Sequence, residues 1–383
     1  MEVTPVSFSV TETSLPALSM PPAGDMVELT DTGTSMHISS AGNTIGKIGV
    51  IVPTCNRVNW LQEAIESLLV QTYENIEIIV IDNCSSDDTP RYAGTLADSR
   101  VVYVRNETNM GVSGSINKAV NMLSDEVEWC TILCDDDYLE KNHIQLMVRK
   151  IHETNANSIV HSHIVFVDAD RALVKEALHS PPEEHAIDFT KARSEFERDR
   201  YLSGLLFKRA NFKAMGGFPV FKTGMAADDA MVFVLALMDR LVYCQEAIAY
   251  IRVHVNAESQ ALNDINGHLT ALLEYKEYCL AMHRKYGSFD SNTNAKLEKY
   301  LSQHICELNT QMWLKCIKNL LKSRDECGAL YRRQLYRLGV DKTYCFPLRI
   351  RISSYFGLYT NCCPESIGMY RSIWRRIQKL LKQ

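Results

Sequence analysis

Several features that would assign this chain to a familiar class are missing from its 383 residues. No uninterrupted apolar run is long enough to span a bilayer, and the N-terminus lacks the positive and apolar regions of a signal peptide. The twelve cysteines include no Cys-x-x-Cys pair and no spacing typical of a metal site. Scattered thiols of this kind favour a reducing compartment, so we expect a cytoplasmic protein.

The glycine-rich loops that commonly hold nucleotides are absent as well. The sequence contains neither Gly-x-Gly-x-x-Gly nor Gly-x-x-x-x-Gly-Lys followed by Ser or Thr, and the segment Gly111–Gly114 is too short for either. If the protein binds a nucleotide, another group must neutralise the phosphates, and a metal ion held by carboxylates is the candidate.

Basic residues are unevenly distributed along the chain. Residues 1–46 have no Lys or Arg, carry five acidic residues and are rich in Ser, Thr and Pro, which predicts disorder. Residues 299–383 hold 16 basic and five acidic residues in a chain whose net charge is −5. We therefore expect an acidic globular domain over residues 47–261, followed by a basic helical region over residues 262–383 that faces an anionic partner.

Short apolar runs alternate with amphipathic stripes in the first half of the expected domain. The runs at 48–52 and 129–133 predict buried strands, and those at 76–81 and 101–104 predict two more strands. The segments 61–69, 90–96 and 113–123 are expected to form helices. Asn59 would cap the first helix. This alternation predicts an α/β fold with a mainly parallel sheet and flanking helices.

Three consecutive carboxylates follow the fourth predicted strand: Asp135, Asp136 and Asp137. Adjacent acids repel one another, so a cation would stabilise them, and oxygen ligands suit Mg²⁺ or Mn²⁺. A solvated acidic turn is the alternative. Because the carboxyl ends of parallel strands form the ligand crevice of such sheets, polar residues that end the first two strands should lie nearby. These residues are Thr54, Asn56, Arg57 and Asp82.

From about residue 47 to residue 260 the sequence resembles the family 2 glycosyltransferases of the GT-A fold. Eight motifs carry this resemblance, and they occur in the order and at the spacing of the family. They are Val52–Arg57, Ser67–Tyr73, Ile79–Asp87, Asn109–Gly111 with Asn117, Asp135–Asp137, Gly216–Phe218, Asp228–Asp229 and Arg252–His254.

The resemblance implies a nucleotide-diphospho-sugar as donor and Mn²⁺ or Mg²⁺ as cofactor. It places Pro53, Thr54, Asn56 and Arg57 near the nucleotide, with Asp82 on the base and Asp135 on the ribose. The implied metal ligands are Asp136, Asp137 and His254. Many family members have an Asp where this chain has Cys134, so the role of each acid is open.

On the acceptor side, the resemblance places Gly216, Gly217 and Asp228, and it assigns the general base of an inverting reaction to Asp229. Acids in a first helical turn are also favoured by the helix dipole alone. A strand over 159–167 would put His161 and His163 on one face, where they line the acceptor cleft or serve only the structure. Residues 179–200 are expected to form a flexible loop.

The expected acceptor is a hydroxyl of a glycan or of a lipid-linked glycan. Residues 371–383 would form an amphipathic helix whose basic flanks suit an anionic membrane surface; an ordinary packed helix is the alternative. No nucleic-acid partner is expected. Two other functions stay open at this stage. A sugar-phosphate nucleotidyltransferase would want a glycine-rich loop after the first strand, and a non-catalytic binding module would be expected to have lost its acids.

Overall fold

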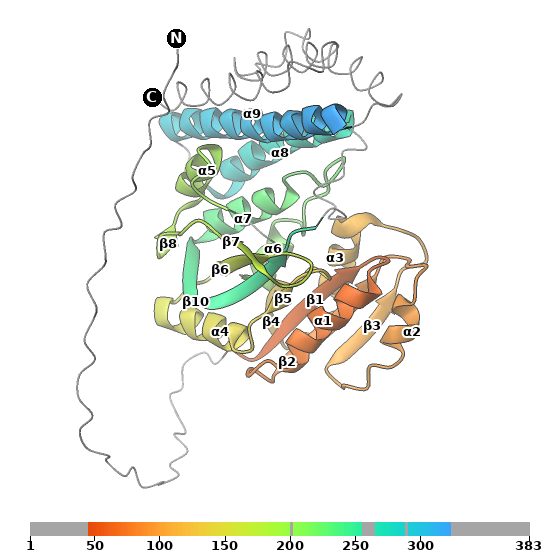
Figure 1. Ribbon diagram of the computed structural model, residues 1–383. Coiled ribbons are helices and arrows are strands. Elements are labelled where there is room, and N and C mark those ends of the chain that lie inside the picture. Colours follow the sequence, from red (N-terminus) through yellow and green to blue (C-terminus); the bar gives the residue numbers. More distant parts are fainter. Residues whose placement is uncertain (1–44, 200–201, 255–264, 288–289, 323–383) are drawn as a thin grey trace, which may run out of the picture. The chain divides into compact units, whose positions relative to one another are not determined.

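We describe a computed structural model, which covers residues 45–199, 202–254, 265–287 and 290–322. Ten strands of this part of the chain form one mixed sheet in the order β3-β2-β1-β4-β9-β6-β10-β5, with β7 beside β6 and β8 beside β10 (Figure 1). The strands are β1 (Lys47–Thr54), β2 (Ile76–Asp82), β3 (Val101–Arg105), β4 (Val127–Ile132), β5 (Tyr138–Leu139), β6 (Ile159–Val167), β7 (Leu173–Glu176), β8 (Glu183–Glu184), β9 (Leu205–Lys208) and β10 (Leu241–Arg252).

The strands β3, β2, β1 and β4 are parallel neighbours, as the alternating pattern predicted. Because β1, β2 and β4 are covered on both faces, their sequences are almost continuously apolar; six of the seven residues of β2 are buried, whereas no residue of the edge strand β3 is. Farther along the sheet, β9 runs antiparallel between β4 and β6, whereas β10 is parallel to β6. The expectation of a mixed, mainly parallel α/β sheet is thus confirmed.

Helices cover both faces of the sheet and create two apolar cores. Helices α1 and α4 pack on one face, whereas α3, α6 and α7 pack on the other. The described helices are α1 (Val58–Leu69), α2 (Thr89–Ala93), α3 (Gly111–Met122), α4 (His143–Thr154), α5 (Ala186–Ser194), α6 (Arg209–Ala214), α7 (Ala227–Met238), α8 (Ile265–Tyr286) and α9 (Ser291–Lys322).

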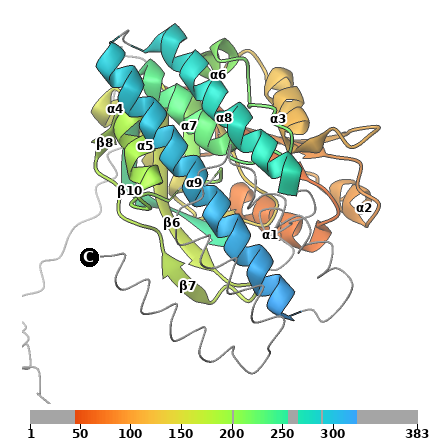
Figure 2. The same cartoon turned by 90° about the horizontal axis from the view of Figure 1, so that it is seen from above.

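The last two described helices belong to the core of the domain. Helix α8 packs on α7, and α9 packs on α5 and α8, as Figures 1 and 2 show. Apolar residues of both helices, including Leu272, Cys279 and Leu301, join the same buried cluster as the α7 side of the sheet. The part of the predicted basic helical region that the structure describes therefore shares a core with the sheet. Residues 371–383 lie outside the described residues.

Two local predictions were wrong. Residues 179–200 were expected to form a flexible loop, but Ala186–Ser194 is helix α5, whose Phe189 is buried. The weak periodicity of this segment hid its contacts with α7 and α9, which tertiary packing supplies. Asn59 does not cap α1, because the helix already begins at Val58 after Arg57. None of the helices in the described ranges is both long and apolar enough to cross a bilayer.

The Gly-Gly-Phe turn after α6 is locked by one side chain of α3. Gly216 and Gly217 adopt φ angles of 95° and 87°, a region that favours glycine. The Asn117 amide donates to Phe218 O at 3.0 Å, and its oxygen accepts from Phe218 N at 2.7 Å. Asn117 therefore donates one hydrogen bond to the turn and accepts another from it, and these two bonds fix the direction in which the chain continues toward α7.

The two glycines of this turn should differ in their tolerance of a methyl group. A Cβ on Gly216 would meet no atom within 4 Å, whereas a Cβ on Gly217 would collide with Asn117 Oδ1. We expect Gly216→Ala to lower the free energy of unfolding by about 1–2 kcal/mol, the cost of the backbone conformation alone. Gly217→Ala should cost about 1–3 kcal/mol more, because the site is overpacked. Urea unfolding of both variants measures the difference, and equal losses would contradict the role of Asn117.

Candidate active site

The carboxyl ends of β1, β2 and β4 lie side by side, so the polar residues that follow them share one edge of the sheet. Thr54 pairs in register with Asp82, and Thr54 O accepts a hydrogen bond from Asn83 N at 2.8 Å. On the other side of β1, Leu133 N donates to Ile51 O at 2.9 Å, which brings the acid triplet alongside the end of β1.

Arg57 crosses from β1 to the acid triplet. Asn56 turns the chain with a φ of 55°, a conformation that Asn tolerates, and α1 starts directly after Arg57. The Arg57 Nη1 atom lies 3.0 Å from Asp135 Oδ1 and 2.8 Å from Asp136 Oδ2. One guanidinium thus contacts two of the three acids that the sequence singled out.

His254 reaches the same acid from the far end of the sheet. It follows β10, and its Nε2 atom lies 3.0 Å from Asp136 Oδ2. The imidazole packs against the indole of Trp60 in α1, with ring centroids 4.0 Å apart. Asp136, separated from His254 by more than a hundred residues of sequence, is therefore the meeting point of β1, β4 and β10.

Asp137 is held by Ser203, which the sequence analysis did not single out, and by the backbone of Arg252. Its Oδ2 accepts from Ser203 Oγ at 2.6 Å, and its Oδ1 accepts from Arg252 N at 3.0 Å. The Arg252 guanidinium donates to Asp136 O at 2.9 Å and to Glu63 at 2.7 Å. The Arg-Val-His motif had pointed to Arg252 as a residue of interest, but the serine carried no pattern of its own.

Burial shifts the titration of the cluster. Desolvation raises the pKa of Asp135 to about 6, with help from the charge of Asp136 and against the opposing effect of Arg57. Desolvation and the charge of Asp136 also raise the pKa of Asp137, although the Ser203 hydrogen bond lowers it. Burial and the charge of Asp136 therefore disfavour the ionised forms of Asp135 and Asp137, and a bound cation would favour them.

The donor set of the cluster fits a divalent cation. Ligand atoms of Cys134, Asp136 and Asp137 lie within 4.8 Å of one another, and His254 Nε2 adjoins the middle acid. Burial raises the pKa of Cys134 well above its usual value, which favours the neutral thiol in the metal-free protein. Two carboxylates and one imidazole suit Mn²⁺ or Mg²⁺ better than a metal that prefers sulfur.

Asp82 organises the loop beside this cluster. It is fully buried, its Oδ1 accepts from Ser85 N at 2.8 Å, and its Oδ2 accepts from Tyr103 Oη at 2.6 Å. Arg105 Nε lies 3.6 Å from the same carboxylate. Asp82 is thus where the sequence expected it, next to Thr54, and its contacts shape the loop that would face a base.

The two acids at the start of α7 have different environments. Asp229 is 1% exposed; its Oδ1 accepts from Arg193 Nε of α5 at 2.9 Å, and its Oδ2 lies 3.2 Å from His304 Nε2 of α9. Asp228 is partly exposed. The structure therefore joins Asp229 to two helices, one of them outside the expected domain, and leaves the side chain of Asp228 nearer to solvent.

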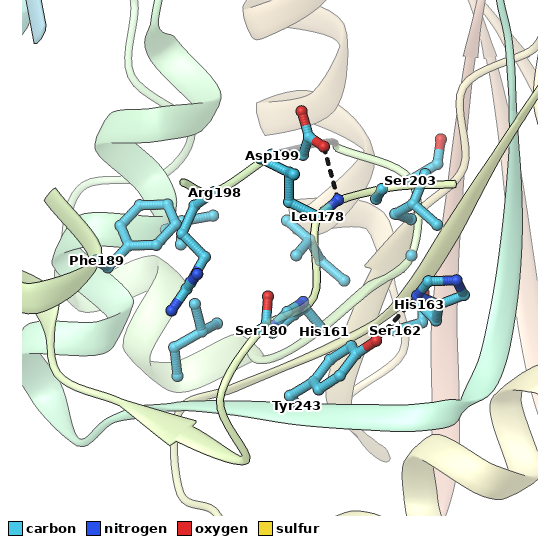
Figure 3. Close-up of a pocket in the computed structure, with 16 residues that line it drawn as sticks. His161, Ser162, His163, Leu178, Ser180, Phe189, Arg198, Asp199, Ser203 and Tyr243 are labelled. Carbon is cyan, nitrogen blue, oxygen red and sulfur yellow. Dashed lines mark hydrogen bonds between the residues drawn. The ribbon is translucent and has the colours of Figure 1, made fainter. Parts of the chain in front are cut away.

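A pocket of about 530 Å³, counted out to its open mouth, lies on the α5 and α7 face of β6 and β10 (Figure 3). His161 and His163 both line it, on either side of Tyr243, whose hydroxyl lies 2.9 Å from His163 Nδ1. Ser203 also lines this pocket while bonding Asp137. The two histidines thus face a cavity that borders the acid cluster.

Comparison with known proteins identifies the family of this site. Residues 49–223 match glycosyl transferase family 2. Glycosyltransferase GlyA of Streptococcus pneumoniae is 32% identical over 126 residues, which are 32% of this chain and 18% of that protein. A GalNAc(5)-diNAcBac-PP-undecaprenol beta-1,3-glucosyltransferase of Campylobacter jejuni is 37% identical over 114 residues, 29% of this chain and 36% of that protein. The chain thus aligns with well under half of either relative's length.

The fold comparison extends over most of the chain. The crystal structure of S. aureus TarS 1–349 in complex with UDP-GlcNAc superposes with a TM-score of 0.56 at 16% identity, covering 87% of this chain and 92% of that one. This likeness supports the fold, whereas the match to the family rests on sequence. Residues 49–223 therefore resemble glycosyl transferase family 2 in sequence, and the chain has the GT-A fold.

Proposed function

We propose that this protein is a metal-dependent, inverting glycosyltransferase that moves a sugar from a nucleotide-diphospho-sugar to a hydroxyl of a glycan or lipid-linked acceptor. The observation that supports it most is the contact of Arg57 with both Asp135 and Asp136, and of His254 with Asp136, at the carboxyl ends of β1 and β4. An acid cluster at this edge of a GT-A sheet is where a donor diphosphate and its metal would be held.

Each part of the cluster has a role in this proposal. Asp136 and His254, with Asp137, would hold Mn²⁺ or Mg²⁺, and Asp135 would bind the ribose. When bound, the metal offsets the charge that develops on the leaving diphosphate. Arg57 adds a second positive group at the same place, and Pro53 with Asn56 shapes the backbone beside it. Asp82 and its loop would face the base.

The α7 acid pair would supply the general base. The acceptor hydroxyl loses its proton to a carboxylate and attacks the anomeric carbon from the face opposite the diphosphate, which inverts the configuration in a single displacement. The resemblance assigns this role to Asp229, but its burial and its contacts with Arg193 and His304 favour an anchoring role. The partly exposed Asp228 is the member of the pair that an acceptor reaches more easily.

Removal of the metal, or of the charge that would hold it, should abolish turnover. We expect Asp136→Asn, which preserves the size of the side chain, to release no nucleotide above background from a panel of nucleotide sugars. Excess EDTA should have the same effect on the unmodified enzyme, with activity restored by Mn²⁺ or Mg²⁺. Asp125→Asn, at an exposed turn, is the matched control. Full activity in EDTA would refute the role of a metal.

Paired Asp228→Asn and Asp229→Asn variants distinguish the base from the anchor. We expect Asp228→Asn to lower kcat by about 10²–10⁴-fold with an unchanged Tm, the usual contribution of general base catalysis. Asp229→Asn should lower the free energy of unfolding by about 3–5 kcal/mol, because Arg193 is left buried without its countercharge. Steady-state kinetics and thermal unfolding of both variants decide. An unchanged Tm with a large kcat loss in Asp229→Asn would return the base role to Asp229.

The sequence of residues 371–383 suggests where the enzyme works. We propose that this basic segment, which lies outside the described residues, holds the protein peripherally at an anionic membrane surface on the cytoplasmic side. Each basic residue near such a surface contributes about 1 kcal/mol, and salt screens the attraction. Flotation with phosphatidylserine vesicles should recover the full chain at low salt but not after deletion of residues 371–383. Recovery of the truncated protein in equal amount would contradict this assignment.

A further inference from the structure

The positive charge of Arg57 lies against the same carboxylates that would bind a metal ion. Its Nη1 atom lies 2.8 Å from Asp136 Oδ2, the same oxygen that lies 3.0 Å from His254 Nε2. That nitrogen also contacts Asp135 Oδ1 at 3.0 Å. The carboxylate of Asp136, which is proposed as a central metal ligand, therefore already contacts the guanidinium of Arg57 and the imidazole of His254.

A divalent cation and a guanidinium repel each other at such distances, so they compete for the same acids. The cluster offers a second arginine, Arg252, but its side chain is 0% exposed and is tied to Glu63 at 2.7 Å. The Arg57 side chain is 23% exposed. Of these two cations, Arg57 is the one that can turn away from the acids toward solvent or toward a bound anion.

We infer that Arg57 is a positioning residue that couples metal binding to donor binding. In the metal-free protein it neutralises Asp135 and Asp136, and with the metal in place it pairs with the diphosphate of the donor. This inference rests on the proposed donor site. Because the diphosphate removes a competitor of the metal, each ligand strengthens the binding of the other by the same factor. Arginine suits both partners, since its planar fork bonds carboxylates and phosphates alike.

Mn²⁺ binding to the full chain, followed by the EPR signal of the free ion, tests this directly and needs no turnover. We expect Arg57→Gln to bind Mn²⁺ alone at least 5-fold more tightly than the unmodified protein, because the competing cation is gone. UDP and GDP should be tried as the diphosphate probe. Whichever nucleotide binds should increase Mn²⁺ affinity by a larger factor in the unmodified protein than in Arg57→Gln, where only direct contact between metal and nucleotide remains.

Two variants control for charge and for folding. Arg57→Lys keeps a cation at the site and should retain the weak metal binding of the unmodified protein. Arg105→Gln removes an equal charge, but Arg105 contacts Asp82 and the carbonyl of Ser85, so this variant should leave metal affinity within 2-fold. Weaker or unchanged Mn²⁺ binding by Arg57→Gln would overturn the inference. If no variant binds Mn²⁺ with or without nucleotide, the metal site of the proposed function fails, and the inference fails with it.

Discussion

Accumulated negative charge at one edge of the sheet is the constraint around which this structure is built. Asp135, Asp136 and Asp137 are each less than 10% exposed, although burial disfavours their ionised forms. Four residues from three separate segments contact these acids: Arg57 after β1, Ser203 before β9, and Arg252 and His254 at the end of β10. Contacts with these three carboxylates therefore join the segments that meet at this edge of the sheet.

The supporting groups divide into two kinds. Ser203 and the backbone of Arg252 bond Asp137 from within the fold, and the Arg252 guanidinium connects the triplet to Glu63 in α1. These contacts are buried and fix the shape of the acid turn. Arg57 and His254 contact the carboxylate of Asp136, and of the two side chains Arg57, at 23% exposed, lies nearer to solvent than His254, at 6%. A binding site for a charged donor needs both kinds of contact: buried groups such as Ser203 and Arg252 that fix the acids, and a group such as Arg57 that can exchange one partner for another.

Local sequence patterns predicted the front of this site well and its surroundings less well. The runs that form β1, β2 and β4 are apolar and end in polar residues, so the sequence alone places their carboxyl ends at one edge of the sheet. The role of Ser203 could not be predicted, because its bond to Asp137 joins residues 66 positions apart and depends on β9 running antiparallel between β4 and β6. Helix α5 was missed for a related reason: its face is defined by α7 and α9 rather than by its own periodicity.

The link between Asp229 and His304 shows how far the site depends on chain beyond the matched family region. The family match ends at residue 223, yet Asp229 of α7 meets Arg193 of α5 and His304 of α9, with Asp229 and His304 each 1% exposed. From the sequence, Asp229 was assigned its role by resemblance to the family, and residues 262–383 were expected to form a helical region separate from the domain. Because a buried carboxylate is costly without buried partners, movement of α9 away from α7 would remove His304 from the groups that stabilise Asp229. The helical region therefore helps to set the geometry of the acid pair. Because Asp228 precedes Asp229 in the first turn of α7, the contacts that hold Asp229 also fix the backbone position of Asp228.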